Sequence, residues 1–302
     1  MPIYLLLPFF AAIVYALGSI SIKRALSDGV VVGQSFHLSN VVLGLVFLPL
    51  FFLGLAKIDW AIVWKPVAMG TAFFIGHWLT FGAIRRGDVS LVTPLMGTKV
   101  VFVALGVVVL SGVMPSASLW IAAFLTTLGI FVMGLGDLKG GSRLAFTIGV
   151  TLASALVFGV SDVFVATWAR GFGAMPFLAV GSATVAAWSL VMWLCQGRPV
   201  FFPKGPGSGW AWAGAIFIAV QAMVMGIGLA LFDDATGINI VYASRGLWVI
   251  ALVVIFGKWL GNREHRDQGR GFLWRIAGTL LLSVAIVIAV MDRARVLAEL
   301  AP

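Results

Sequence analysis

Residues 236–291 read TGINIVYASRGLWVIALVVIFGKWLGNREHRDQGRGFLWRIAGTLLLSVAIVIAVM and contain two apolar runs, each long enough to cross a bilayer. The first run carries one arginine, Arg245, near its middle. A charged side chain at that depth costs about 3 kcal/mol or more, and such residues usually serve a function. Arg245 is therefore the first candidate for a functional site.

The composition of the rest of the chain agrees with a membrane protein. Hydrophobic residues make up 61% and charged residues 10%, whereas a soluble domain typically has about 25% charged residues. The net charge of +9 is spread over short connections and forms no single basic face, so we expect the lipid bilayer, and no nucleic acid, as a partner. The first apolar run has no basic residue before it, which favours a retained helix over a removed signal peptide.

About 20 apolar residues are needed for each crossing, and this criterion predicts ten transmembrane helices with short connections between them. Helices are expected because lipid offers no hydrogen-bond partner to an open strand. The predicted segments are 3–22, 35–55, 66–84, 89–111, 118–136, 144–167, 174–195, 209–231, 238–259 and 273–291.

The order of these segments indicates an internal repeat. Gly97 in the fourth segment and Gly112 just after it correspond to Gly246 in the ninth segment and Gly261 just after it, at a constant offset of 149 residues. The repeat predicts two five-helix units, residues 1–137 and 144–292, followed by a short tail at 293–302. Because five crossings is an odd number, the second unit must be inverted relative to the first, as in alternating-access transporters whose substrate site lies between the halves.

The basic residues also predict an orientation. Thirteen Lys and Arg lie in the odd-numbered connections, and five lie in the even-numbered connections and the tail. The positive-inside rule therefore predicts a multi-pass protein of the plasma (inner) membrane with both termini outside.

Four stretches resemble the drug/metabolite transporter superfamily in its ten-helix EamA-type form. They are GDVSLVTPLMGTKVVFVALGVVVLSG (87–112) and LWIAAFLTTLGIFVMGLGD (119–137), with TGINIVYASRGLWVIALVVIFGKWLG (236–261) and WRIAGTLLLSVAIVIAVMD (274–292) in the second half. The resemblance covers nearly the whole chain and implies two five-helix repeats and metabolite export. It also implies termini in the cytoplasm, which is opposite to the charge count.

The ninth segment predicts the main binding residues. Tyr242, Arg245 and Trp248 recur every three residues, so a helix would place them on one face. The guanidinium fork suits a carboxylate or a phosphate. The alternative is a buried arginine that Asp162 or backbone carbonyls neutralise, so that it only joins two helices.

Two further charges lie inside predicted crossings. Lys99 belongs to the repeat-related fourth segment, where it either adds positive charge to the same site or extends to the membrane interface. Asp162 lies in the sixth segment and either pairs with a cation, carries a proton, or ends its helix at the interface. Two cations facing one site favour an anionic or zwitterionic substrate.

His77 and Gln221 occupy matching positions in the third and eighth segments and are candidates for substrate binding. His77 is also a candidate for charge coupling, because histidine titrates near neutral pH. The alternative for both is a hydrogen bond between helices.

Several classes of protein lack their sequence signals here. No phosphate-binding loop is present, and the histidines and the single cysteine have no metal-ligand spacing, so we expect no enzyme, no cofactor and no bound metal. We expect a secondary active transporter that exports a small anionic or zwitterionic metabolite by alternating access, as a monomer or homodimer. A flippase for a lipid phosphate and a non-transporting membrane receptor or partner protein are the alternatives.

Overall fold

The structure is a computed structural model of the chain and describes residues 2–54, 58–86, 92, 95–135, 144–256 and 270–300. Throughout these ranges the backbone forms helices with short connections and no β-strand, which confirms the prediction of an all-α protein. The helices, with η marking a 3-10 helix, are η1 Ile3–Leu5, α1 Leu6–Ser27, α2 Val32–Phe52, η3 Trp60–Ile62, α3 Trp64–Arg86, η4 Met96–Thr98, α5 Lys99–Ser111, α6 Ala117–Gly134, α7 Leu144–Phe172, α8 Ala174–Cys195, α9 Ser208–Leu231, α10 Ala235–Tyr242, α11 Arg245–Phe256 and α12 Arg270–Leu300.

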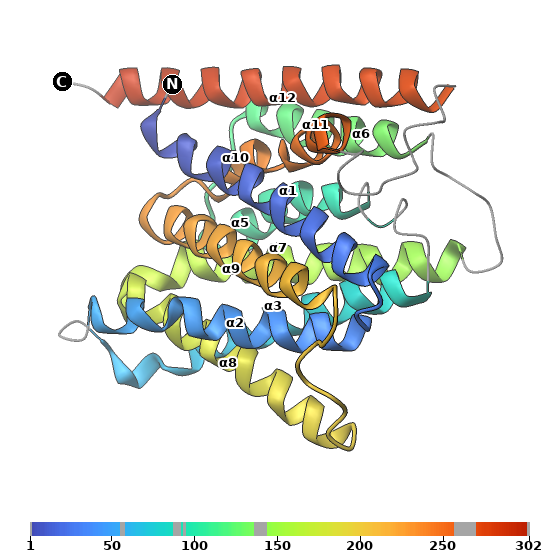
Figure 1. The fold of residues 1–302 in the computed structure, drawn as a ribbon. Coiled ribbons are helices and arrows are strands. Elements are labelled where there is room, and N and C mark those ends of the chain that lie inside the picture. Colours follow the sequence, from blue (N-terminus) through green and yellow to red (C-terminus); the bar gives the residue numbers. More distant parts are fainter. Residues whose placement is uncertain are drawn as a thin grey trace.

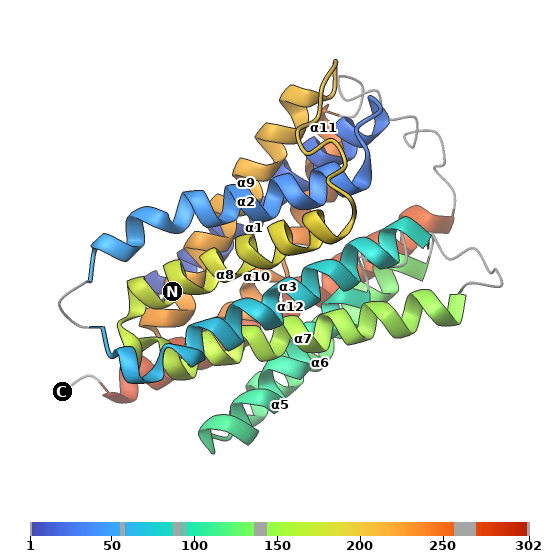
Figure 2. The same ribbon diagram turned by 90° about the horizontal axis from the view of Figure 1, so that it is seen from below.

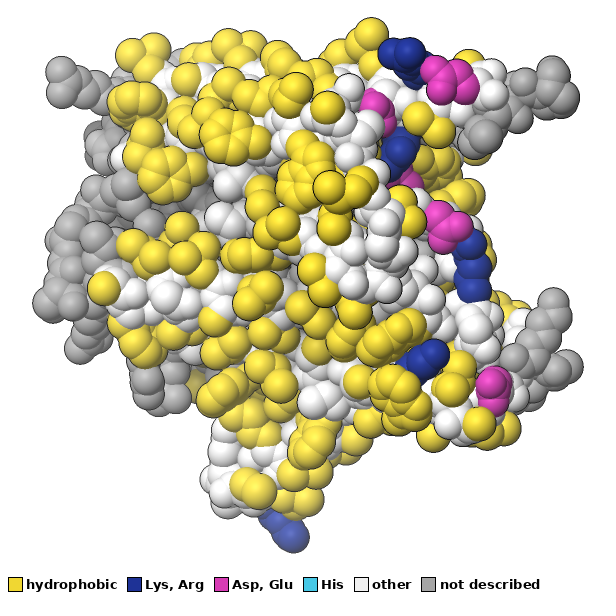
Figure 3. All heavy atoms as spheres, turned by 180° about the vertical axis from the view of Figure 1, so that it is seen from behind, with side chains coloured by type: hydrophobic (Ala, Val, Ile, Leu, Met, Phe, Trp, Pro, Cys, Tyr) yellow, Lys and Arg dark blue, Asp and Glu magenta, His cyan; other side chains and the backbone are white. Residues whose placement is uncertain are grey.

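Six helical stretches in the described part of the chain are long and apolar enough to cross a membrane. They are Ile3–Ser27, Val32–Phe52, Ala145–Phe172, Ala174–Cys195, Ser208–Leu231 and Ile276–Val296. Hydrophobic side chains cover most of the face in Figure 3, and charged side chains gather mainly along one edge. The protein is therefore a multi-pass membrane protein whose apolar surface faces lipid.

The helix boundaries follow the predicted segments closely in places. The bounds of α8 match the predicted 174–195, whereas α12 extends well beyond the predicted 273–291 at its C-terminal side. Residues 293–300, expected in a tail, continue α12 because a helix can extend past an apolar run into polar surroundings. The start of the predicted fourth segment and the end of the ninth lie outside the described residues.

The ninth segment is bent where the sequence suggests a continuous helix. It divides into α10 and α11 at Ala243 and Ser244, where Leu247 N–H donates to the Ser244 carbonyl at 2.9 Å, an i to i−3 bond. In the fourth segment, η4 similarly precedes α5. Each change in helical geometry is followed at once by a cation, Arg245 in one case and Lys99 in the other.

The helices pack as pairs from distant parts of the sequence. In Figure 1, α12 lies along α6 at the top, α1 crosses α9 in the middle, and α2 lies near α8 below. Figure 2 shows α3 and α7 running side by side. The start of α1 and the end of α12 lie on the same side in both views, and we call that side the terminal end.

Gly70 allows one of these close pairs to form. It lies in α3, where an added Cβ would overlap the carbonyl oxygen of Gly181 in α8. Small residues at such crossings let membrane helices approach closely.

We expect Gly70→Ala to lower the thermal stability of the purified protein in detergent, because overpacking typically costs about 1–3 kcal/mol. Gly149 in α7 has open space around it, so Gly149→Ala is the matched control and gains helix propensity of up to about 1 kcal/mol. Equal melting temperatures for the two variants would contradict the close approach of α3 and α8.

Candidate functional site

Arg245, the first residue of α11, lies against two tyrosine rings. Its guanidinium carbon is 4.6 Å from the ring centre of Tyr242 in α10 and 5.0 Å from that of Tyr15 in α1. The Tyr242 hydroxyl donates to Gln221 Oε1 in α9 at 2.7 Å, which fixes the orientation of the tyrosine. The residues that the structure describes place no carboxylate within ion-pair distance of Arg245.

Lys99 and Asp162 form a buried ion pair next to this arginine. Lys99 Nζ lies 2.6 Å from Asp162 Oδ2, and the two residues are 8% and 7% exposed. Lys99 Nζ also lies 5.9 Å from the ring centre of Tyr242, so this ring contacts both cations. In this arrangement Lys99 does not extend to the interface. Asp162 pairs directly with Lys99 and not with Arg245.

The charges of these residues do not cancel. Asp162 offsets one cation, and one positive charge remains among Lys99, Asp162 and Arg245. A remaining charge in a low-dielectric environment favours a binding partner of opposite sign.

Two other predicted residues do not contact Arg245 or Lys99 directly: His77 lies close to the ion pair, and Trp248 packs elsewhere. His77 is separated from Lys99 by Phe158, whose ring centre is 6.1 Å from the imidazole and 5.9 Å from Lys99 Nζ. Trp248 packs edge-on against Phe9 at 5.5 Å, and no described contact joins it to Arg245. The site therefore brings together Arg245, Tyr242, Gln221, Lys99 and Asp162, with His77 behind Phe158.

Tyr15 and Phe158 were not among the site residues predicted from the sequence. The chain has three tyrosines, and each of them contacts a charged or polar side chain. Tyr15 and Tyr242 contact Arg245, and the Tyr4 hydroxyl donates to Asp234 Oδ2 at 2.6 Å. The rarity of tyrosine was a usable signal for Tyr15, whereas Phe158 is one of 23 phenylalanines and carries no such signal.

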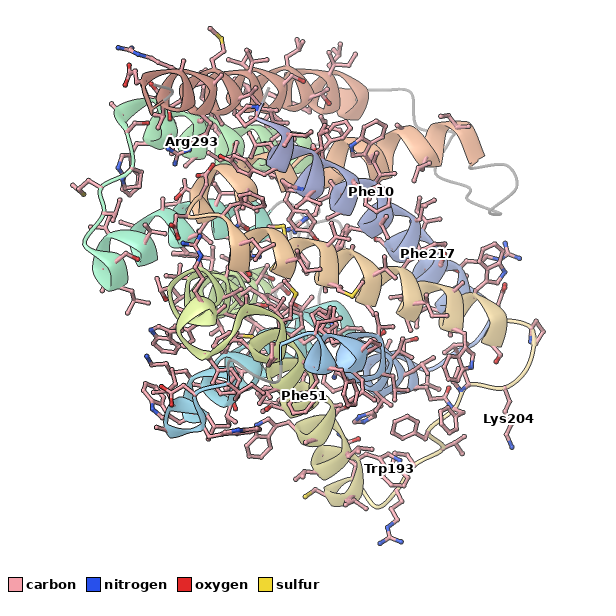
Figure 4. The ribbon with its side chains drawn as sticks, turned by 90° about the vertical axis from the view of Figure 1, so that its left-hand side faces the viewer. Phe10, Phe51, Trp193, Lys204, Phe217 and Arg293 are labelled. Carbon is pink, nitrogen blue, oxygen red and sulfur yellow. The ribbon has the colours of Figure 1, made fainter. Side chains whose placement is uncertain are left out.

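A second polar cluster lies at the terminal end. Asp234 precedes α10 and accepts hydrogen bonds from Tyr4 and from Arg293 Nη2, the latter at 2.7 Å. Asp292, the neighbour of Arg293 in α12, accepts from the Ser116 hydroxyl at the start of α6 at 2.8 Å. Figure 4 shows Arg293 beneath α12, on the side of α6. The cluster joins four separate elements at one end of the bundle.

Comparison with known proteins supports the fold alone. No family model matches the chain, and no curated protein matches it. A solved chain described as a crystal structure of a protein has a TM-score of 0.73 and 17% identity, over 97% of this chain and 98% of its own length. The whole helical architecture thus occurs in another protein, and this likeness carries no information on function.

The buried ion pair makes a prediction about stability. Lys99→Met leaves Asp162 buried without its partner, which typically costs about 3–5 kcal/mol. Adding Asp162→Asn should recover much of that loss, because the unpaired charge is removed. Thermal unfolding in detergent measures both variants.

Arg295 and Glu299 form an exposed pair at 2.9 Å and provide the matched control. Arg295→Met should change stability by less than about 1 kcal/mol, as is usual for surface pairs. Strictly additive effects of the Lys99 and Asp162 substitutions would argue against their pairing.

Proposed function

We propose that the protein is a secondary active transporter that moves a small anionic or zwitterionic metabolite across the plasma (inner) membrane by alternating access. One observation carries the proposal: Arg245 has no described carboxylate partner, while Asp162 is occupied by Lys99. A binding site with one surplus positive charge inside the membrane suits a substrate with a carboxylate or phosphate group.

The position of the two tyrosines supports this role for Arg245. Their rings lie at 4.6 Å and 5.0 Å from the guanidinium carbon, and cation–π contacts favour ring faces. The guanidinium also hydrogen-bonds the Tyr242 side chain, and its other N–H groups can bind the oxygens of an anion. Arg245 is also only half-buried, unlike Lys99 and Asp162.

The helix packing supports two inverted five-helix repeats, with α10 and α11 together as one crossing. In the two repeats, α1 corresponds to α7, α3 corresponds to α9, and α5 corresponds to α10 and α11 together. If the repeats are related by symmetry, each contact should have a counterpart between the corresponding helices. The contact of α1 with α9 has its counterpart in α7 with α3, and the contact of α5 with α7 has its counterpart in α11 with α1. The pairs α2 with α8 and α6 with α12 are unchanged by the exchange. This pattern favours a site between the two repeats.

Direction and coupling complete the proposal. The resemblance to drug/metabolite transporters favours export, and the distribution of basic residues favours termini outside the cytoplasm. A proton or substrate gradient drives the cycle, with Asp162 or His77 compensating charge while Arg245 and Lys99 hold the anionic group. Gln221 orients Tyr242 at the same site.

Flux of a panel of amino acids and organic phosphates into proteoliposomes tests the proposal. Loss of a charged hydrogen bond costs about 1.5–3 kcal/mol, so we expect Arg245→Ala to weaken apparent substrate affinity roughly 10-fold to 100-fold. Arg245→Lys should recover little, because lysine lacks the planar fork.

Lys204→Ala is the matched control for removal of one positive charge. Lys204 is exposed in the connection before α9 and points away from the bundle in Figure 4. Transport that is unchanged in Arg245→Ala, in protein that is folded by size-exclusion chromatography, would exclude the anchoring role. Transport of no member of the panel by the wild-type protein would count against the whole proposal.

A further inference from the structure

The net charge of the candidate site follows from three side chains. Lys99 and Asp162 are paired at 2.6 Å, and their charges sum to zero whichever of the two holds the proton between them. Arg245 stays charged, because a guanidinium is not deprotonated in proteins. The sum over the three side chains is therefore one positive charge, and it does not depend on where the proton of the ion pair lies.

The aromatic neighbours leave this sum unchanged. Tyr15 and Tyr242 lie against the guanidinium, and Phe158 lies beside the ammonium of the ion pair. Phenol and phenyl rings carry no charge near pH 8, and an imidazole is mostly neutral there. His77, on the other side of the Phe158 ring, therefore adds no charge at that pH.

The helices that carry the two cations have no other charge within their described ranges. Lys99 is the one charged residue of α5, and Arg245 is the one charged residue of α11. Within its own range α10 has none. Asp234, which precedes α10, lies eight residues before Tyr242 and pairs with Arg293 at 2.7 Å.

The charges on the two neighbouring helices lie well beyond the site. Lys23 is the first charged residue of α1 and lies eight residues beyond Tyr15, which is about 12 Å along the helix axis. In α7, Arg170 lies the same distance beyond Asp162 and has its own partner, Asp233, at 2.7 Å. Among the described residues, a small ligand at the site thus meets one surplus positive charge at short range.

A ligand that leaves water for this site loses the hydration of each of its charged groups. A single anionic group regains a partner at Arg245, while Lys99 and Asp162 keep each other. A zwitterion also brings a cation, for which the nearby described carboxylate, Asp162, is already occupied. A second anionic group finds a cation only if Lys99 leaves Asp162, and a buried charge without its partner is costly.

We propose that the site selects substrates that carry one net negative charge, and that its own charge sets this preference. The inference rests on the proposed transport function and narrows its substrate to monoanions, such as a monocarboxylate or a phosphodiester. Each unit of charge that ligand and site leave uncancelled weakens binding. A substitution that changes the charge of the site should therefore change the preferred charge of the ligand by the same amount, with opposite sign.

Competition with the flux of the best panel substrate measures the preference of the wild type near pH 8. Four probes share a four-carbon skeleton: succinamide is uncharged, γ-aminobutyrate is a zwitterion, succinamate carries one negative charge and succinate carries two. We expect succinamate to inhibit at a concentration at least about tenfold lower than each of the others. A hydrogen bond to a charged group contributes at least that much.

Three variants change the charge of the site in known steps. Asp162→Asn raises it to two positive charges, so succinate should become the strongest competitor. Arg245→Gln lowers it to zero and should remove the advantage of succinamate over succinamide. Lys99→Gln combined with Asp162→Asn keeps one positive charge, so succinamate should remain the strongest. Damage to the fold would weaken all four probes together and would not reorder them.

Asp233→Asn is the matched control for Asp162→Asn. Asp233 also pairs with one cation, but its side chain is 74% exposed, so its substitution should leave the order of the probes unchanged. Thermal stabilisation of the purified protein by each probe gives the same order for a variant whose flux is too low to measure. If Asp162→Asn does not fold, Arg245→Gln decides, and a retained preference for succinamate then overturns the inference.

The remaining outcomes separate this inference from the transport function. A transporting wild type for which succinamate is not the strongest competitor overturns the charge selection and leaves the transport function standing. A folded Asp162→Asn variant that keeps the wild-type order does the same. A wild type that transports no member of the panel overturns both.

Discussion

The cost of charge inside a bilayer constrains the whole interior of this protein. Lys99 and Asp162 meet this constraint by pairing at 2.6 Å. Arg245 meets it differently, through the faces of Tyr15 and Tyr242. Aromatic faces attract a cation but do not neutralise it. The packing of α1, α5, α7, α10 and α11 therefore brings three charged side chains together, and one of them, Arg245, has no carboxylate partner among the described residues.

The backbone contributes to the same arrangement. Both cations begin an α-helix directly after a local change of helical geometry, at η4 for Lys99 and at Ala243 and Ser244 for Arg245. Tyr242 and Arg245 are three residues apart across this change of geometry, and the guanidinium lies over the ring of Tyr242. Gln221 holds that ring from α9, so three segments fix the position of one cation.

The sequence was sufficient for features that depend on hydrophobicity and on single unusual residues. The helix at 174–195 and the membrane positions of Lys99, Asp162 and Arg245 follow from apolar run length and the rarity of charge. Contacts between helices far apart in the sequence could not be predicted from it. Asp162 was equally plausible as a partner for either cation, and nothing in the order of residues indicated that it pairs with Lys99. The change of helical geometry at Ser244 was also not predicted, although Gly246 follows it by two residues and donates to the Ala243 carbonyl.

The anchoring of α10 links the terminal end to the cation site. Asp234 accepts from Gly237 N–H at the first turn of α10 and is held by Tyr4 and Arg293 on either side. An eight-residue helix is about 12 Å long, so Asp234 and Tyr242 lie at the two ends of α10. Displacement of Asp234 would therefore reach Tyr242 at the far end of α10, and through it the ring against which Arg245 lies. Lys99 and Asp162 belong to α5 and α7, which both contact α10, and Arg170 of α7 pairs with Asp233 next to this cluster. Under the proposed function, an anion bound by both Arg245 and Lys99 would join α11 to α5, so a state that separates these two helices would lose contacts with the anion.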